Sequence, residues 1–263
     1  MTTMMTKPAP PSRPADLKTR AGRLGLYGLV AHWDQMQEKP WVEELLGLEE
    51  TERQRRSLER RVRHARLGRF KPMTDFDWGW PQQLDRAAVE DLFRFDFLAE
   101  AANVVLTGPN GVGKTMIAQN LAHQAVLRGH TVRFTTASEL LNDLAAQEAG
   151  SGLLRRLRRY CHPDLLVIDE VGYLASTSTH ADLLFEVVTR RYEQKSIVLT
   201  TNKPFREWNE VFPNSSCVSP MLDRLVHKAE IINLDGESYR AKEAMERTAK
   251  SAKQRSGRKK KGD

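Results

Sequence analysis

The sequence has few cysteines and no long apolar segment. Cys161 and Cys217 are its two cysteines in 263 residues, too few for a disulfide framework. No apolar run approaches the roughly 20 residues that a membrane-spanning helix needs, and no apolar signal segment follows Met1. These absences exclude a disulfide-stapled secreted domain and a transmembrane protein. They favour a cytoplasmic protein that does not interact with a membrane.

Positive charge is concentrated in two segments. The chain carries a net charge of +7, of which Arg53–Lys71 contributes +8 and Arg247–Asp263 contributes +7, so the remainder carries −8. Clustered Lys and Arg release counterions when they neutralise phosphates, which suggests a polyanionic partner. The alternative is that both segments are merely solvated. For the C-terminal segment the two interpretations are equally open.

The composition predicts four regions. Residues 1–16 contain four prolines and almost no apolar side chain, so they are predicted to be a disordered leader. Residues 17–75 are predicted to form a helical N-terminal module, residues 76–245 the main α/β domain, and residues 246–263 a basic disordered tail. The aromatic-rich stretch from Phe70 to Leu98 is expected to pack the helical module against the main domain.

Apolar spacing predicts the secondary structure of both folded regions. In the first, helices are expected over 17–37, 41–48 and 49–67. In the second, strands alternate with helices, which predicts a doubly wound parallel sheet with ligands at the carboxyl ends of its strands. The five expected strands span residues 102–107, 131–135, 165–169, 196–201 and 230–234.

The segment GPNGVGKT matches the phosphate-binding loop G-x-x-x-x-G-K-[ST] in full and lies between a predicted strand and a predicted helix. The amides of such a loop bind phosphate oxygens, Lys114 reaches the β- and γ-phosphates, and the Thr115 hydroxyl ligates Mg²⁺. ATP is therefore the expected cofactor. The predicted nucleotide-binding residues are Gly108, Pro109, Asn110, Gly111, Val112, Gly113, Lys114, Thr115 and Met116.

Polar side chains end two of the predicted strands. Asp169 and Glu170 follow the apolar run 165–168, so Asp169 is predicted to hold Mg²⁺ and Glu170 to act as the general base for hydrolysis. Asn202 follows the next strand and is a candidate for orienting the attacking water. An Asn that merely opens the turn before Lys203-Pro204 is the alternative.

Two arginines lie far from these motifs in the sequence. Arg224 is predicted to act across a subunit boundary, where it would neutralise charge on the transferred phosphoryl group. Arg240 is a candidate for sensing the nucleotide. For Arg240 an unpartnered surface arginine is an equally open interpretation.

Five segments in this order and spacing resemble the signatures of the IstB family of AAA+ proteins, which assist insertion-sequence transposases. They are Gly108–Thr115, Leu165–Leu174, Leu199–Trp208, Leu222–Leu225 and Gly236–Arg240. The likeness spans roughly residues 17–245. It implies an AAA+ ATPase domain at 76–245 that forms a ring or spiral homo-oligomer on double-stranded DNA and recruits or stimulates a cognate transposase.

The resemblance also implies that the helical module grips DNA, and the segment Arg53–Arg69 has the composition to contact phosphates. The arginines predicted to do so are Arg55, Arg56, Arg60, Arg63 and Arg66. Two other functions stay open. A helicase loader similar to DnaC would share this core, and a DNA scaffold could bind ATP without hydrolysing it.

Overall fold

The computed structural model describes residues 14–147, 150–172, 177–213 and 215–248. The chain divides into two compact units, Met1–Arg60 and Arg61–Asp263. Most of the predicted leader and tail lies outside the described residues, although residues 14–16 begin the first helix and residues 239–248 are helical. The predicted division into four regions stays a prediction.

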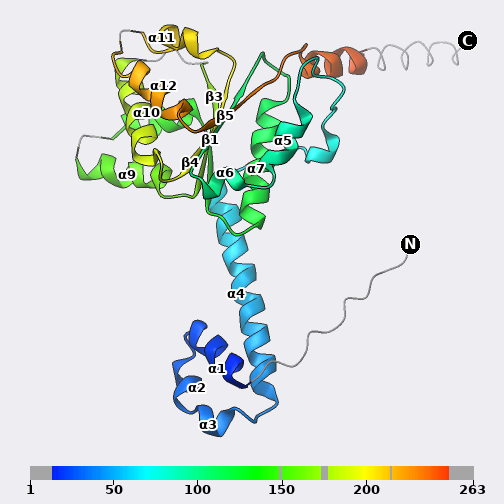
Figure 1. The fold of residues 1–263 in the computed structure, drawn as a ribbon, viewed down its shortest axis with the longest axis vertical. Coiled ribbons are helices and arrows are strands. Elements are labelled where there is room, and N and C mark those ends of the chain that lie inside the picture. Colours follow the sequence, from blue (N-terminus) through cyan, green and yellow to red (C-terminus); the bar gives the residue numbers. More distant parts are fainter. Residues whose placement is uncertain (1–13, 148–149, 173–176, 214, 249–263) are drawn as a thin grey trace, which may run out of the picture. The chain divides into compact units, whose positions relative to one another are not determined.

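The N-terminal unit contains three short helices and the first part of a long one (Figure 1). They are α1 (Pro14–Arg23), α2 (Tyr27–Ala31), α3 (Trp33–Met36) and α4 (Trp41–Ala65). Their core consists of Leu17, Ala21, Leu24, Trp33, Val42 and Leu46.

The helix boundaries predicted for this region were wrong in two places. A single helix over 17–37 does not form, because Gly25 (φ +67°) ends α1 in a Schellman motif in which the Leu26 amide donates to the Ala21 carbonyl. The helices predicted over 41–48 and 49–67 are instead one helix, α4. The helix continues through the expected junction between residues 48 and 49. Thr51 Oγ1 donates to the Gly47 carbonyl across it at 2.8 Å, and an ion pair between Arg53 and Glu49, at i and i+4, follows directly.

The second unit contains the predicted five-stranded parallel sheet. Its strands lie in the order β2-β3-β4-β1-β5, which places β1 and its following loop between β4 and β5. The strands are β1 (Asn103–Thr107), β2 (Val132–Thr136), β3 (Leu165–Val171), β4 (Ser196–Thr201) and β5 (Ala229–Asn233).

Helices cover both faces of this sheet (Figure 1). Val105, Leu166 and Leu199 belong to a core shared with α8, α9, α10 and α12, whereas α7 packs on the strands from the other face. Alternate residues along a buried strand point to opposite faces, so the central strands β3 and β4 are apolar over Leu165–Ile168 and Ile197–Leu199. The helices of this unit are α5 (Arg86–Leu92), α6 (Asp96–Ala99), α7 (Lys114–Leu127), α8 (Ala137–Ala145), α9 (Ser151–Cys161), α10 (Ser178–Arg191), α11 (Trp208–Val211) and α12 (Val218–Val226), with 3₁₀ turns at Met73–Asp75 and Phe205–Glu207.

None of the helices in the described part of the chain combines the length and the apolar character needed to span a bilayer.

Candidate nucleotide-binding site

The loop between β1 and α7 has a conformation that depends on glycine. Gly108 and Gly111 have φ angles of +145° and +82°, which L-residues with a side chain rarely adopt. Space is also lacking, because a Cβ on Gly108 would lie 1.9 Å from the Leu234 carbonyl oxygen and one on Gly111 would lie 2.2 Å from Ser238 Oγ. The predicted phosphate-binding loop is therefore closely packed against the chain that follows β5.

Lys114 begins α7 and extends its side chain back over the loop. Its Nζ donates hydrogen bonds of 2.6 Å to the carbonyl oxygens of Gly108 and Pro109. Burial lowers the pKa of Lys114 to about 8; the charge of Asp169 opposes the shift, and that of Arg240 adds to it. A buried ammonium beside a glycine-rich loop is suited to an anionic ligand.

Asp169 is the centre of a small hydrogen-bond network at the end of β3. Its Oδ1 accepts from Thr115 Oγ1 at 3.1 Å and from Thr200 Oγ1 at 2.5 Å. Burial raises the pKa of the Asp169 carboxyl group, and these two hydrogen bonds oppose the rise. Thr115 and Asp169, predicted separately as Mg²⁺ ligands, are thus in direct contact. Their oxygens are the donors that Mg²⁺ prefers alongside phosphates, so the donor set fits this ion.

Glu170 lies at an irregularity of the sheet. The register between β3 and β4 shifts between Ile168 and Val171, and Glu170 has a φ angle of +62°. Its amide donates to Thr200 Oγ1 at 2.9 Å, and its side chain is exposed at the cavity described below. The bulge therefore turns Glu170 out of the sheet while Asp169 stays buried.

Asn202 follows β4 and also lines this cavity. Its Oδ1 is buried and has no hydrogen-bond partner in the part of the chain that the structure describes. Leaving a buried oxygen without a hydrogen bond costs free energy, and a ligand or water in the cavity could supply the missing donor.

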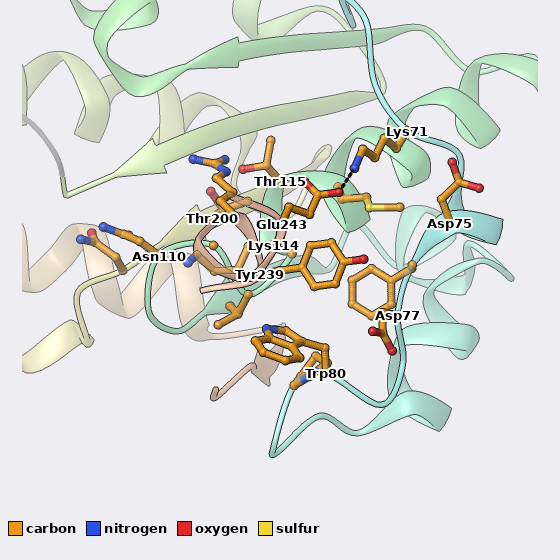
Figure 2. Close-up of a pocket in the computed structure, with 18 of the residues that line it drawn as sticks. Lys71, Asp75, Asp77, Trp80, Asn110, Lys114, Thr115, Thr200, Tyr239 and Glu243 are labelled. Carbon is orange, nitrogen blue, oxygen red and sulfur yellow. Dashed lines mark hydrogen bonds and ion pairs between the residues drawn. The ribbon is translucent and has the colours of Figure 1, made fainter. Parts of the chain in front are cut away.

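A cavity of about 260 Å³ joins these residues to an aromatic wall (Figure 2). Lys114, Thr115 and Thr200 lie on one side of it, and Trp80 and Tyr239 lie on the other. The further lining residues that sequence reasoning missed are Lys71, Asp75, Phe76, Asp77, Pro81, Thr200, Thr201 and Glu243. Part of the stretch 70–98, expected to pack two modules together, instead lines this cavity.

The aromatic wall is held by contacts between two segments far apart in the sequence. Trp80 Nε1 donates to the Glu237 carbonyl at 2.8 Å, and its ring meets that of Tyr239 edge to face at 5.9 Å. Lys71 pairs with Glu243 at 2.7 Å, and both residues also line the cavity (Figure 2). The Tyr239 amide donates to the Gly111 carbonyl at 3.0 Å, which connects this wall to the phosphate-binding loop.

The two predicted arginines occupy different positions. Arg240 lines the cavity. Arg224 is not among the residues that line it; the Arg224 guanidinium donates to Thr189 Oγ1 and lies 4.8 Å from the centre of the Phe185 ring. Arg240 therefore lies at the cavity of its own chain, whereas Arg224, on α12, contacts α10.

The five arginines predicted to contact DNA fall into two groups. Arg55 pairs with Glu52 and Glu59, and Arg56 pairs with Glu52. Within the described residues the other three form no ion pair, and all three are exposed: they are Arg60, Arg63 and Arg66. The second group therefore has charge available for a phosphate without breaking an existing pair.

This fold and this cavity define a P-loop ATP-binding protein of the AAA+ class: a phosphate-binding loop, an acidic strand end and a polar neighbouring strand meet at the carboxyl edge of one parallel sheet. Within that class, the chain belongs to the family of IstB-like ATP binding proteins, whose model matches residues 21–247.

Relatives from insertion sequences cover most of the chain. The ATP-binding protein of IS5376 from Geobacillus stearothermophilus is 35% identical over 230 residues, covering 84% of this chain and 92% of the relative. The ATP-binding protein of IS21 from Pseudomonas aeruginosa is 35% identical over 237 residues, covering 87% and 89%.

Solved structures share the fold at low identity. DnaI has a TM-score of 0.51 at 18% identity, covering 64% of this chain and 89% of DnaI. The replication initiator DnaA, bound to AMPPCP and single-stranded DNA, has a TM-score of 0.50 at 16% identity, covering 62% and 52%.

Proposed function

We propose that this protein is an ATPase that assembles on duplex target DNA in the cytoplasm and recruits or stimulates the transposase of its insertion sequence. The family membership and the relatives from insertion sequences support the transposition role. The observation that carries the ATPase part is the gathering of Lys114, Thr115, Glu170 and Asn202 at one cavity, with the buried Asp169 hydrogen-bonded to Thr115.

Each of these residues has a role that its position supports. The loop amides and Lys114 would hold the phosphates of ATP, and Thr115 and Asp169 would hold Mg²⁺, which supplies charge neutralisation at the phosphates when bound. Glu170, exposed at the cavity, would accept the proton of the attacking water. Asn202 would orient that water through its unpaired Oδ1. Arg240 would report whether the nucleotide is present.

Hydrolysis would depend on assembly through Arg224. This arginine lies outside the cavity of its own chain, so it would complete the site of a neighbouring subunit in a ring or spiral homo-oligomer. Withdrawing Arg224 from Thr189 and Phe185 would break one side-chain hydrogen bond and one cation–π contact in a half-buried position, each worth about 1–2 kcal/mol.

DNA binding would use the basic segments of the chain. Arg60 and Arg63 on α4 and Arg66 directly after it are the strongest candidates, since they are exposed and form no ion pair among the described residues. Arg55 and Arg56 would first have to leave Glu52. Contacts of this kind are made to phosphates, so binding would be insensitive to base sequence and would weaken with salt.

The proposed function is tested by steady-state ATP turnover with and without duplex DNA. We expect duplex DNA to raise the rate, and Glu170→Gln to lower kcat by about 100-fold or more while ATP still binds, since a general base contributes at least this factor. Glu210→Gln, which removes an exposed carboxylate away from the cavity, is the matched control and should leave the rate unchanged.

Two outcomes would favour the rival functions. Unchanged turnover in Glu170→Gln, or no turnover in the wild type on DNA, would indicate a scaffold that uses ATP only to assemble. A preference for single-stranded DNA, together with capture of a replicative helicase and not of the transposase, would indicate a helicase loader.

A further inference from the structure

Within the described residues, a buried arginine on the edge strand of the sheet has no carboxylate partner. Arg133 lies in β2, and its side chain is largely enclosed, with the residue 7% exposed. Its Nη1 makes a long hydrogen bond of 3.5 Å to the His64 carbonyl, and its Nε has no partner among the residues described. A buried guanidinium without a counter-charge is costly, so this arrangement calls for an anionic partner.

The residues beside Arg133 add positive charge. Its guanidinium lies 5.7 Å from the centre of the Tyr160 ring, and Tyr160 donates its hydroxyl to Asp143 at 2.7 Å. The same carboxylate is shared by Arg156 at 3.4 Å and Arg159 at 3.8 Å. The Asp143 carboxylate therefore binds two arginines and the Tyr160 hydroxyl, and it does not contact Arg133.

Arg66 contributes a further unpaired cation to this cluster. It is exposed, it directly follows α4, and its φ angle of +55° turns the chain at the helix end. Burial, followed by the nearby charges of Arg159 and Arg66, lowers the pKa of Arg133. Among the described residues, the ion pairs of this group of arginines are those of Arg156 and Arg159 with Asp143, and Arg66 and Arg133 have none.

The cluster is separate from the nucleotide cavity. Arg133 pairs in the sheet with Leu166, three positions before Asp169, which at 3.3 Å per residue places it about 10 Å back along the strands. None of Arg66, Arg133 and Arg159 lines the cavity. A phosphate bound here would therefore not be one that Lys114 holds.

We propose that Arg66, Arg133 and Arg159 form a phosphate-binding site for the backbone of bound duplex DNA. The forked guanidinium groups of arginine match phosphate oxygens, and Arg133, enclosed by Tyr160, is held ready for such a contact. Arg66 and Arg159 close the site from the end of α4 and from α9. This inference rests on the proposed DNA binding and gives it a site on the ATPase unit.

The test is the salt dependence of binding to a fluorescently labelled duplex, measured by anisotropy with the full chain. The double variant Arg66→Gln/Arg159→Gln avoids the buried Arg133 and should fold normally, which unchanged ATP binding and thermal unfolding would verify. Losing two phosphate contacts should reduce the slope of log Kd against log salt by about 1.8, and weaken binding at least tenfold near 0.1 M salt.

The matched control is Arg94→Gln/Arg206→Gln, which removes the same charge from the same unit at side chains 71% and 85% exposed. Its slope should equal that of the wild type.

Equal slopes for the two double variants, with DNA still bound, would overturn the site and leave the proposed function standing. Wild type that binds no duplex would refute the DNA function itself. If inorganic pyrophosphate loses affinity in Arg66→Gln/Arg159→Gln while the DNA slope stays unchanged, the site takes a free phosphate compound and the DNA assignment is wrong.

Discussion

Lys114 carries a positive charge into a largely enclosed position beside the phosphate-binding loop. With a pKa of about 8 when no phosphate is bound, it is protonated near neutral pH and loses its proton as the pH rises through this value. Phosphates would favour the charged form, so the pKa rises on binding. The binding energy that this charge provides is therefore fully present below pH 8 and decreases above it.

We accordingly expect the affinity for ATP to be constant between pH 7 and 7.5 and to fall above pH 8, approaching tenfold per pH unit. Titration of a fluorescent ATP analogue from pH 7 to 9.5 measures this. Lys114→Met should bind weakly at every pH and show no such fall. A wild-type affinity that stays flat to pH 9.5 would contradict the argument.

At the residue scale, local patterns predicted more than long-range contacts did. The loop 108–115 could be identified from sequence because its glycines and Lys114 lie within eight consecutive positions. Thr200 was missed, since its contact with Asp169 depends on the pairing of β3 with β4. Trp80 and Tyr239 were missed for a similar reason: nothing in either local sequence indicates that they meet.

At the scale of elements, one buried arginine joins α10 to the end of α9 and the start of β4. Arg191 donates to the carbonyl oxygens of Tyr160, Cys161, Pro163, Asp164 and Ser196, at distances from 2.6 to 3.2 Å. These carbonyls include the last turn of α9, which lacks intrahelical partners. Arg191 thus donates to the free carbonyl oxygens of the turn that leads into β3, the strand that carries Asp169.

Arg191→Met should therefore lower the free energy of unfolding by about 2–4 kcal/mol, because several buried carbonyls lose their donor. Its neighbour Arg190 is 41% exposed and pairs with Glu186 within α10, so Arg190→Met should change stability by less than about 0.5 kcal/mol. Urea unfolding of both variants measures the difference. If both variants lowered the free energy of unfolding equally, burial and backbone contacts would not explain the contribution of Arg191 to stability.

Helix ends were the least predictable elements. Apolar spacing alone could not show that Gly25 would end α1, nor that α4 would continue past residue 48, because both depend on local capping and ion pairs. The strands of the second unit were predicted well. The central strands β3 and β4 contain short apolar runs followed by polar residues, and burial on both faces of a parallel sheet requires this pattern.

At the scale of the whole molecule, the account depends on a site completed by a second chain. Each chain has a cavity lined by Lys114, Thr115 and Glu170, and each holds Arg224 outside that cavity. Removing such an arginine typically lowers turnover by about 10³-fold or more. Arg224→Ala and Glu170→Gln should therefore each be nearly inactive alone, for different reasons.

The most direct test is ATP turnover of an equimolar mixture of Glu170→Gln and Arg224→Ala on duplex DNA. If Arg224 acts across the subunit boundary, random assembly pairs an intact Glu170 with an intact Arg224 at one interface in four, so the mixture should recover about a quarter of the wild-type rate. A mixture no more active than the two variants measured separately, although light scattering shows that they assemble together, would contradict a shared site.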